Sequence, residues 1–174
     1  KAIMALLIAT VMIIVYIAFA FRQVPKSIGA WRFGLTAIVA LIHDLIITLG
    51  VFVVLGQVLN VEIDALFITA LLTIMGFSVH DTIVVFDRLR ENLRHQGSGE
   101  TFETVAERAV NETVVRSFNT SFSTFITVTV LFFLGAVSIK YFLLALMIGF
   151  VVGTYSSIFI ATPLLVSWNN RQKM

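Results

Sequence analysis

The sequence contains no cysteine, which excludes a disulfide framework and any metal site built on thiolates. Charged residues are also scarce: they make up 13% of the 174 residues, whereas soluble domains contain about a quarter. Hydrophobic residues make up 59%, and the mean hydropathy is +0.99. Because so few polar side chains cannot coat a water-soluble globule, the composition predicts an integral membrane protein.

Long apolar runs are what the sequence does contain. A helix needs about 20 apolar residues to cross the hydrocarbon core of a bilayer. Helices are expected because an open sheet would leave backbone groups unpaired in lipid, and barrel strands are about half as long and alternate in polarity. The predicted fold is therefore an all-α membrane protein, a bundle of five transmembrane helices. Their expected bounds are residues 2–21, 33–55, 65–86, 117–137 and 141–168.

The basic residues are unevenly shared between the connections. Of the 12 lysines and arginines, all but Lys1 and Lys140 lie between residues 22 and 32, between residues 88 and 116, or in the C-terminal tail. Cytoplasmic loops carry the excess of lysine and arginine in membrane proteins. These connections and the C-terminus are therefore expected in the cytoplasm and the N-terminus outside, so that a further span is expected upstream.

The cytoplasmic loop of residues 87–116 is the one sizeable polar segment. The stretch HQGSGE (His95 to Glu100) is typical of a turn, and Thr101 after it is suited to cap a helix. Apolar residues then recur at helical spacing from Phe102 to Val110. This pattern predicts an amphipathic cytoplasmic helix that leads into the fourth span. It would lie on the membrane surface or pack on the protein, with a partner-docking surface as the alternative.

The fifth span carries small residues on one face. They are spaced four apart, and Gly149 and Gly153 form a Gly-x-x-x-Gly motif. Such a face lets two helix backbones approach closely, so it predicts helix packing and no chemistry. The row comprises Ala145, Gly149, Gly153, Ser157 and Ala161.

Two acidic residues lie where lipid should exclude them. Asp44 is near the middle of the second span, and Asp81 is near the cytoplasmic end of the third. A charged aspartate at a helix centre costs about 2.5 to 3.5 kcal/mol, so each needs a partner, water or a proton. A carboxylate of this kind, beside a cation that comes and goes, can exchange protons. Asp44 could equally be a buried structural residue that holds helices together.

The candidate cation for Asp81 is Arg116, at the start of the fourth span. It heads a polar stripe on one helix face, and the second span has a parallel stripe around Asp44. We expect these stripes to face a common interior, because lipid disfavours them. Two plainer alternatives are hydroxyls that bond only to their own backbone, and a static ion pair of Asp81 with Arg116. The stripes comprise Thr120, Ser123, Thr124 and Thr127 after Arg116, and Thr36, Asp44 and Thr48 in the second span.

A histidine precedes each aspartate: His43 stands before Asp44 and His80 before Asp81. Neighbouring residues of a helix point about 100° apart, so the four side chains do not easily converge on one ion. Their spacing is not a metal-ligand signature, and no metal or other cofactor is expected. His80 remains a candidate member of a proton relay, because histidine titrates near physiological pH.

Three motifs cover nearly the whole chain in order: GFSVHDTIVVFDRLREN (Gly76 to Asn92), ALIHDLIITLGVF (Ala40 to Phe52) and NETVVRSFNTSFSTF (Asn111 to Phe125). The first resembles the fourth-helix motif of the SecF family of the bacterial Sec protein-export system. The other two resemble its preceding helix and its fifth helix. The family is a branch of the resistance-nodulation-division superfamily, and the sister family SecD, with similar motifs, is the near alternative.

The resemblance implies a six-helix subunit with a large extracytoplasmic domain between its first and second helices. The five spans here would be the second to sixth, and the first helix and periplasmic domain are absent from this sequence. The resemblance also implies that Asp81 is the proton-responsive carboxylate, with Arg116 and Thr82 as its companions. His80 stands where the motif usually has asparagine. Together with Asp44, these residues form the expected proton relay.

The expected function is that of an accessory subunit, not an enzyme, which uses the proton-motive force to promote preprotein translocation. The implied partners are SecD (fused or separate), the SecYEG translocon, SecA, preproteins and membrane lipid, with no nucleic acid. The implied location is the bacterial inner membrane, multi-pass, with a cytoplasmic C-terminus. Alternatives are a small-molecule efflux subunit of the same superfamily, a structural scaffold for a translocon, and an intramembrane aspartyl hydrolase, although the Gly-x-Gly-Asp arrangement of the last is missing.

Overall fold

The computed structural model describes residues 2–21, 29–97 and 99–171, and these residues are almost entirely helical. Asp64 caps one helix by accepting a 2.9 Å hydrogen bond from the backbone N–H of Phe67. Thr101 caps the next helix by accepting from the backbone N–H of Thr104, as its position in the sequence predicts. The elements are α1 (Ala2–Ala20), α2 (Ala30–Leu59), α3 (Ala65–Arg94), α4 (Phe102–Leu134), the short 3₁₀ turn η1 (Val137–Ile139), α5 (Lys140–Ser156), the π-helical segment η2 (Ser157–Ala161) and α6 (Thr162–Arg171).

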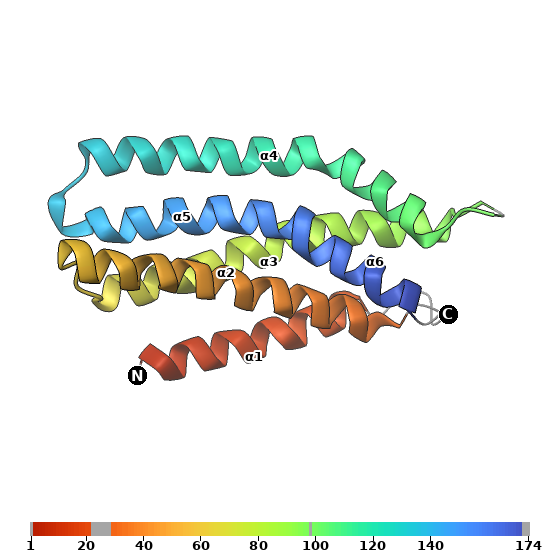
Figure 1. Cartoon of the computed structure of the whole chain (residues 1–174), viewed down its shortest axis with the longest axis horizontal. Helices are drawn as coiled ribbons and strands as arrows, with labels where there is room; N and C mark the ends of the chain where they lie inside the picture. Colours follow the sequence, from red (N-terminus) through yellow and green to blue (C-terminus); the bar gives the residue numbers. More distant parts are fainter. Residues whose placement is uncertain (1, 22–28, 98, 172–174) are drawn as a thin grey trace.

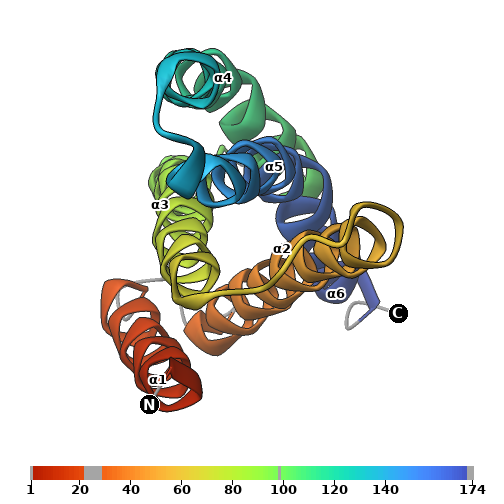
Figure 2. The same cartoon turned by 90° about the vertical axis from the view of Figure 1, so that its left-hand side faces the viewer.

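The long helices run side by side along one axis (Figure 1). Helix α3 packs against α4 and α5, and α2 packs against α3 and α5. Seen along the bundle, α1 lies at one edge beside α2 and α3, whereas α4 lies at the opposite edge beside α3 and α5 (Figure 2). Helices α2, α3 and α5 therefore surround the middle of the bundle.

Four helical stretches among the described residues are long and apolar enough to cross a membrane: Trp31–Leu59, Ala65–Arg94, Phe102–Leu134 and Val137–Arg171. They correspond to four of the five predicted spans and fit a multi-pass membrane protein. The first predicted span is also helical, but its described apolar part, Met4–Ile17, is shorter, so its crossing stays a prediction.

The predicted loop of residues 87–116 is mostly helix. Helix α3 continues to Arg94. Helix α4 begins at Phe102 and runs without a break into the apolar stretch of the predicted fourth span. The first turns of α4 bury Phe102, Val105 and Ala106 in the core. That apolar face packs on the protein itself, which is the plainer of the two expectations for this segment.

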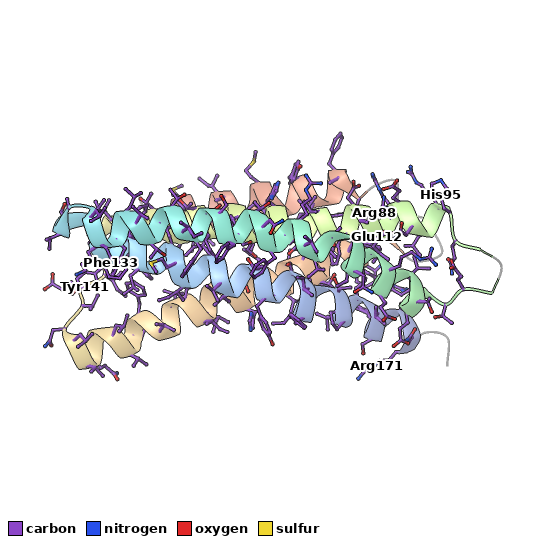
Figure 3. The ribbon with its side chains drawn as sticks, turned by 90° about the horizontal axis from the view of Figure 1, so that it is seen from above. Arg88, His95, Glu112, Phe133, Tyr141 and Arg171 are labelled. Carbon is purple, nitrogen blue, oxygen red and sulfur yellow. The ribbon has the colours of Figure 1, made fainter. Side chains whose placement is uncertain are left out.

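Charged side chains tie α3 to α4 at one end of the molecule. The guanidinium of Arg88 in α3 donates 2.7 Å hydrogen bonds to Oε2 of Glu91 and to Oε2 of Glu112. The side-chain amide of Asn92 donates to the same oxygen of Glu112 at 2.8 Å. Figure 3 shows Arg88 and Glu112 together toward the end that also carries His95 and Arg171, with Phe133 and Tyr141 toward the other end. These charged side chains therefore join two helices.

Small residues allow α5 to approach α3. A β-carbon built on Gly149 would lie 2.3 Å from a side-chain carbon of Ile74. One built on Gly153 would lie 3.3 Å from the β-carbon of Ser78. The predicted Gly-x-x-x-Gly face thus lies at the crossing of α5 and α3, where the absence of a side chain on the glycines lets the two helices approach closely. This crossing brings α5 next to the polar residues described below.

Candidate functional site

Asp44 lies in the middle of α2 and is completely buried. Its Oδ2 atom accepts a 2.5 Å hydrogen bond from the Ser78 hydroxyl of α3 and a 2.7 Å bond from the Ser156 hydroxyl at the end of α5. Its Oδ1 atom lies 3.0 Å from Nδ1 of His43. Three helices therefore meet at one carboxyl group whose two oxygens are both hydrogen-bonded, which offsets the cost of burying it.

The polar stripe of α2 faces the interior, as predicted. Thr36 and Thr48 are completely buried, like Asp44. Both threonine hydroxyls donate to carbonyls of their own helix, Thr48 to that of Asp44 and Thr36 to that of Arg32. These hydroxyls therefore bond to their own backbone, which is the plainer alternative given above for the polar stripes. The carboxyl group of Asp44 is the part of the stripe that reaches other helices.

Asp81 is the second buried carboxylate and lies on α3, with 5% of its surface exposed. Its Oδ2 atom accepts a 2.6 Å hydrogen bond from the Ser157 hydroxyl. The neighbouring Thr82 is also buried, and its hydroxyl has no partner among the described residues. His80, on the other side of Asp81, is exposed.

Arg116 does not meet Asp81 in this structure. It is exposed on α4, and it forms no ion pair with any described residue. The reason is the orientation of α4, which turns the face of Ser117, Ser121 and Val128 inward. Residues that neighbour each other on a helix point about 100° apart, so burying Ser117 directs Arg116 outward.

Most of the α4 stripe is exposed as well, and Thr124 is half-buried. Thr120, Ser123 and Thr127 all lie on the outer face of the described structure. Thr127 donates to the carbonyl of Ser123, and Thr124 to that of Thr120. The expectation that the stripes of α2 and α4 face one interior is therefore not met here: the α2 stripe faces inward, and the α4 stripe faces away from the bundle.

The sequence does not identify the hydroxyls that bind the two carboxylates, and it assigns Ser157 to helix packing alone. Ser156 and Ser157 stand at the junction of α5 with the π-helical segment η2, and Ser78 lies on α3. Serines in apolar helices usually bond to their own backbone, so their types alone did not mark them. A signal was available in Pro163. Proline lacks an N–H and crowds the carbonyl four residues earlier, which favours a widened turn just before it, and such π segments are frequent at functional sites.

The geometry suits proton binding better than metal binding. Each carboxylate is buried and held by hydroxyls, which can donate to the ionised form and accept from the protonated form. Nowhere in residues 2–21, 29–97 and 99–171 do three histidine or acidic side chains gather closely enough to hold a metal ion. These features, with four apolar spans, define a multi-pass helical membrane protein with ionisable groups in its interior.

The family "Protein export membrane protein SecD/SecF, C-terminal" matches residues 1–171, and the chain belongs to this family. The chain is 53% identical over 172 residues to the protein translocase subunit SecF of Thermobaculum terrenum, which covers 98% of the chain and 53% of that relative. It is 40% identical over 176 residues to the protein translocase subunit SecDF of Thermus thermophilus, covering 99% of the chain and 22% of that relative.

The fold is also that of a solved SecDF structure. The structure described as "Crystal structure of SecDF in Super-membrane-facing form" has a TM-score of 0.81 and 38% identity to the chain, covering 98% of the chain and 22% of that structure. The chain spans about half the length of the SecF relatives that it matches. These matches support the resemblance to SecF, or to the SecF half of a SecDF protein.

Proposed function

We propose that the chain is the membrane part of an accessory subunit of the Sec translocon, which uses the proton-motive force to promote preprotein translocation across the bacterial inner membrane. The relatives named SecF and SecDF support this function. The observation that carries the coupling mechanism is the burial of Asp81 in α3, hydrogen-bonded to one hydroxyl of another element. Neither small-molecule efflux nor peptide hydrolysis is supported by these relatives.

In this proposal Asp81 takes a proton from a path open to the outside and releases it toward the cytoplasm. Arg116 stabilises the ionised form in one state of the cycle, while Thr82, His80 and Asp44 extend the relay. Because Arg116 is directed outward in this structure, the proposal requires α4 to turn or shift relative to α3. One proton that crosses 100 mV supplies about 2.3 kcal/mol, which biases a two-state element about fiftyfold.

The outward polar face also supports SecD as the partner. Arg116 and Thr120 of α4 and Thr73 and His80 of α3 are exposed. Such side chains are costly in lipid and are expected to face protein or a water-filled cavity. We assign this face to the contact with SecD, fused or separate. The SecYEG translocon, SecA and the preprotein would be engaged by the complete assembly, whose first helix and periplasmic domain lie outside this sequence.

The arginines support the proposed orientation in the inner membrane. Arg88, Arg94, Arg108 and Arg171 belong to the ends of α3, α4 and α6 that meet at one end of the bundle (Figure 3). Lys140 begins α5 at the other end. Because the excess of basic residues marks the cytoplasmic side, this distribution supports a C-terminus in the cytoplasm, with η1 on the outside.

The test is Asp81→Asn in the full-length protein, assembled with SecD in inverted membrane vesicles that contain SecYEG. Stimulation of translocation by the proton-motive force is expected to disappear, while ATP-driven translocation by SecA and membrane insertion stay normal. Asp87→Asn is the matched control, because Asp87 is exposed and pairs with Arg90 near the helix end. Normal stimulation in Asp81→Asn would refute the assignment and favour a structural scaffold.

A further inference from the structure

The two buried carboxylates are joined through neighbouring residues of a third element. Asp44 of α2 binds the hydroxyl of Ser156 at 2.7 Å, and Asp81 of α3 binds that of Ser157 at 2.6 Å. Consecutive residues of a helix point about 100° apart, so one pair of adjacent serines can serve acids on two different helices. A single peptide unit joins the two serines.

This pair lies at the start of the π-helical segment η2 (Ser157–Ala161). The Thr162 hydroxyl donates to the carbonyl of Ser157 at 3.2 Å, which supplies a donor to a carbonyl within the widened turn. Pro163 follows and cannot donate a backbone N–H. The serines therefore stand where the helix backbone is less regular than in α5, and where small shifts of donors are less costly than in a regular α-helix.

His43 is the exposed end of the same arrangement. Its Nδ1 lies 3.0 Å from Asp44 Oδ1, and its side chain is 30% exposed, whereas that of Asp44 is completely buried. No described residue is a partner of its Nε2. Ser78, Ser156 and Ser157 are each at most 1% exposed. Among these groups, His43 is thus the one that can exchange a proton with its surroundings.

We propose that His43 and Asp44 form a second proton-binding site, loaded at His43 Nε2, and that Ser156 and Ser157 couple its charge to that of Asp81. This inference rests on the proposed function, because it adds a second site to the same proton cycle. Nε2 takes a proton from outside the bundle, and Nδ1 passes its own proton to Oδ1 of Asp44. An imidazolium and a carboxylate thereby become a neutral imidazole and a carboxylic acid.

The coupling follows from the difference in hydrogen bonding between the ionised and the protonated form of Asp44. An ionised carboxylate accepts hydrogen bonds strongly, whereas the protonated group holds hydroxyl donors less tightly. Protonation of Asp44 therefore loosens Ser156, and the shift of the peptide that joins it to Ser157 changes the hydrogen bond to Asp81. Deprotonation reverses the change, so each acid responds to the charge of the other.

Few other charges face this site from the packed elements. In the described residues, α1 and η2 carry no charged residue, while the charges of α5 and α6 are Lys140 and Arg171 at their far ends. Tyr155 of α5 is exposed. On α3, only His80 and Asp81 lie within one turn of Ser78, and the charges from Asp87 onward lie near its end. Among the described residues, His43 is therefore the ionisable group in direct contact with Asp44.

The experiment is infrared difference spectroscopy of the full-length protein with SecD in lipid vesicles, as a function of pH. The carbonyl bands of the two acids are assigned from their loss in Asp44→Asn and Asp81→Asn. We expect both acids to titrate, and Asp44→Asn to move the midpoint of the Asp81 band by about fivefold or more in proton concentration, the lower end of typical couplings between sites. An Asp81 midpoint that is the same with and without Asp44 would overturn the proposal.

The serines are tested in the same spectra. In a Ser156→Ala, Ser157→Ala double variant, Asp44→Asn is expected to leave the Asp81 midpoint unmoved. Threonine at both positions retains the hydroxyls and is expected to retain the coupling. Coupling of unchanged size in a folded alanine variant would contradict the role of the serines. If the alanine variant does not fold, loss of coupling in either single alanine variant supports the proposal and full coupling in both contradicts it.

His43 is tested by the rate of loading after a pH jump. In His43→Gln the appearance of the Asp44 band is expected to slow about tenfold or more, and added imidazole is expected to restore part of the rate. His95→Gln is the control, because His95 lies exposed at the end of α3. An unchanged rate in His43→Gln would contradict the loading role. These infrared readouts do not depend on translocation. If Asp81→Asn translocates normally while the bands of Asp44 and Asp81 are still coupled, the proposed function is rejected and the coupling of the two acids is retained.

Discussion

Gly149 of α5 lies directly against Ile74 of α3, where a β-carbon on the glycine would come 2.3 Å from Cγ1 and 2.4 Å from Cδ1 of the isoleucine. Gly149→Ala is therefore expected to lower the free energy of unfolding by about 1 to 3 kcal/mol, the usual cost of overpacking. Unfolding in mixed detergent micelles measures the change.

The control is Gly50→Ala, since nothing lies within 4 Å of a β-carbon built there. That variant should be neutral or should gain up to about 1 kcal/mol from helix propensity. Combining Gly149→Ala with Ile74→Ala should cost less than the sum of the two single changes, because the smaller side chain leaves room. Strict additivity would show that the two residues do not contact each other in the membrane.

Ser78 holds Asp44 across the α2–α3 interface. Ser78→Ala removes the 2.5 Å hydrogen bond to the buried carboxyl group. Hydrogen bonds between membrane helices contribute on average about 0.6 kcal/mol and at most about 1.7 kcal/mol, so a loss in this range is expected in the same unfolding assay. Ser138→Ala, at an exposed position in η1, is the control and should change nothing. Equal stability of both variants would mean that Ser78 does not support Asp44.

Arg88 and Glu112 join the ends of α3 and α4. R88E places like charges beside Glu91 and Glu112 and is expected to reduce stability only slightly, since the paired side chains are over a third exposed and their charges are screened by solvent. Adding E112R recreates an opposite-charge pair and should restore most of the loss at low salt. E107R is the control for the second change, because Glu107 lies exposed on the same helix. Equal rescue by both second changes would exclude a specific pair.

Glu100 in the loop before α4 is the carboxyl group whose titration is simplest to follow. The Arg108 side chain, and after it the backbone N–H of Gly97, hydrogen-bond to Glu100 and lower its pKa from the ordinary value of 4.5. A lowered pKa in the folded state means that the pair stabilises the loop above about pH 4.5. That contribution is lost as the pH falls through the folded-state pKa.

Arg108→Gln is therefore expected to raise the pKa of Glu100 toward 4.5. It should loosen the loop at neutral pH, and the difference from the parent protein should vanish at pH values below the folded-state pKa. An NMR titration of labelled glutamate in the full-length protein measures the pKa. Arg171→Gln, in α6, is the control. A Glu100 pKa that does not respond to Arg108→Gln would show that the pair is absent in solution.

The helices and the burial of both acids could be predicted from residue types alone. Apolar runs determine helices in lipid, and an aspartate in such a run must face protein, as Asp44 and Asp81 do. The partners of the acids could not be predicted in this way, because the bonds from Ser156 and Ser157 depend on how α5 crosses α2 and α3. The place of Arg116 at the start of the fourth span predicts its pairing with Asp81, whereas the rotation of α4 about its axis is set by the packing of its inner face.

The π-helical segment affects which face of the last span is buried after α5. In a regular α-helix, four residues advance about 400°, so a row spaced four apart drifts by about 40° at each step and winds around the helix. Yet Ala145, Gly149, Gly153, Ser157 and Ala161 are all buried. A wider turn rotates less per residue and opposes this drift. The segment Ser157–Ala161 thus counteracts this drift and keeps the small side chains on the buried side of the helix from α5 into α6.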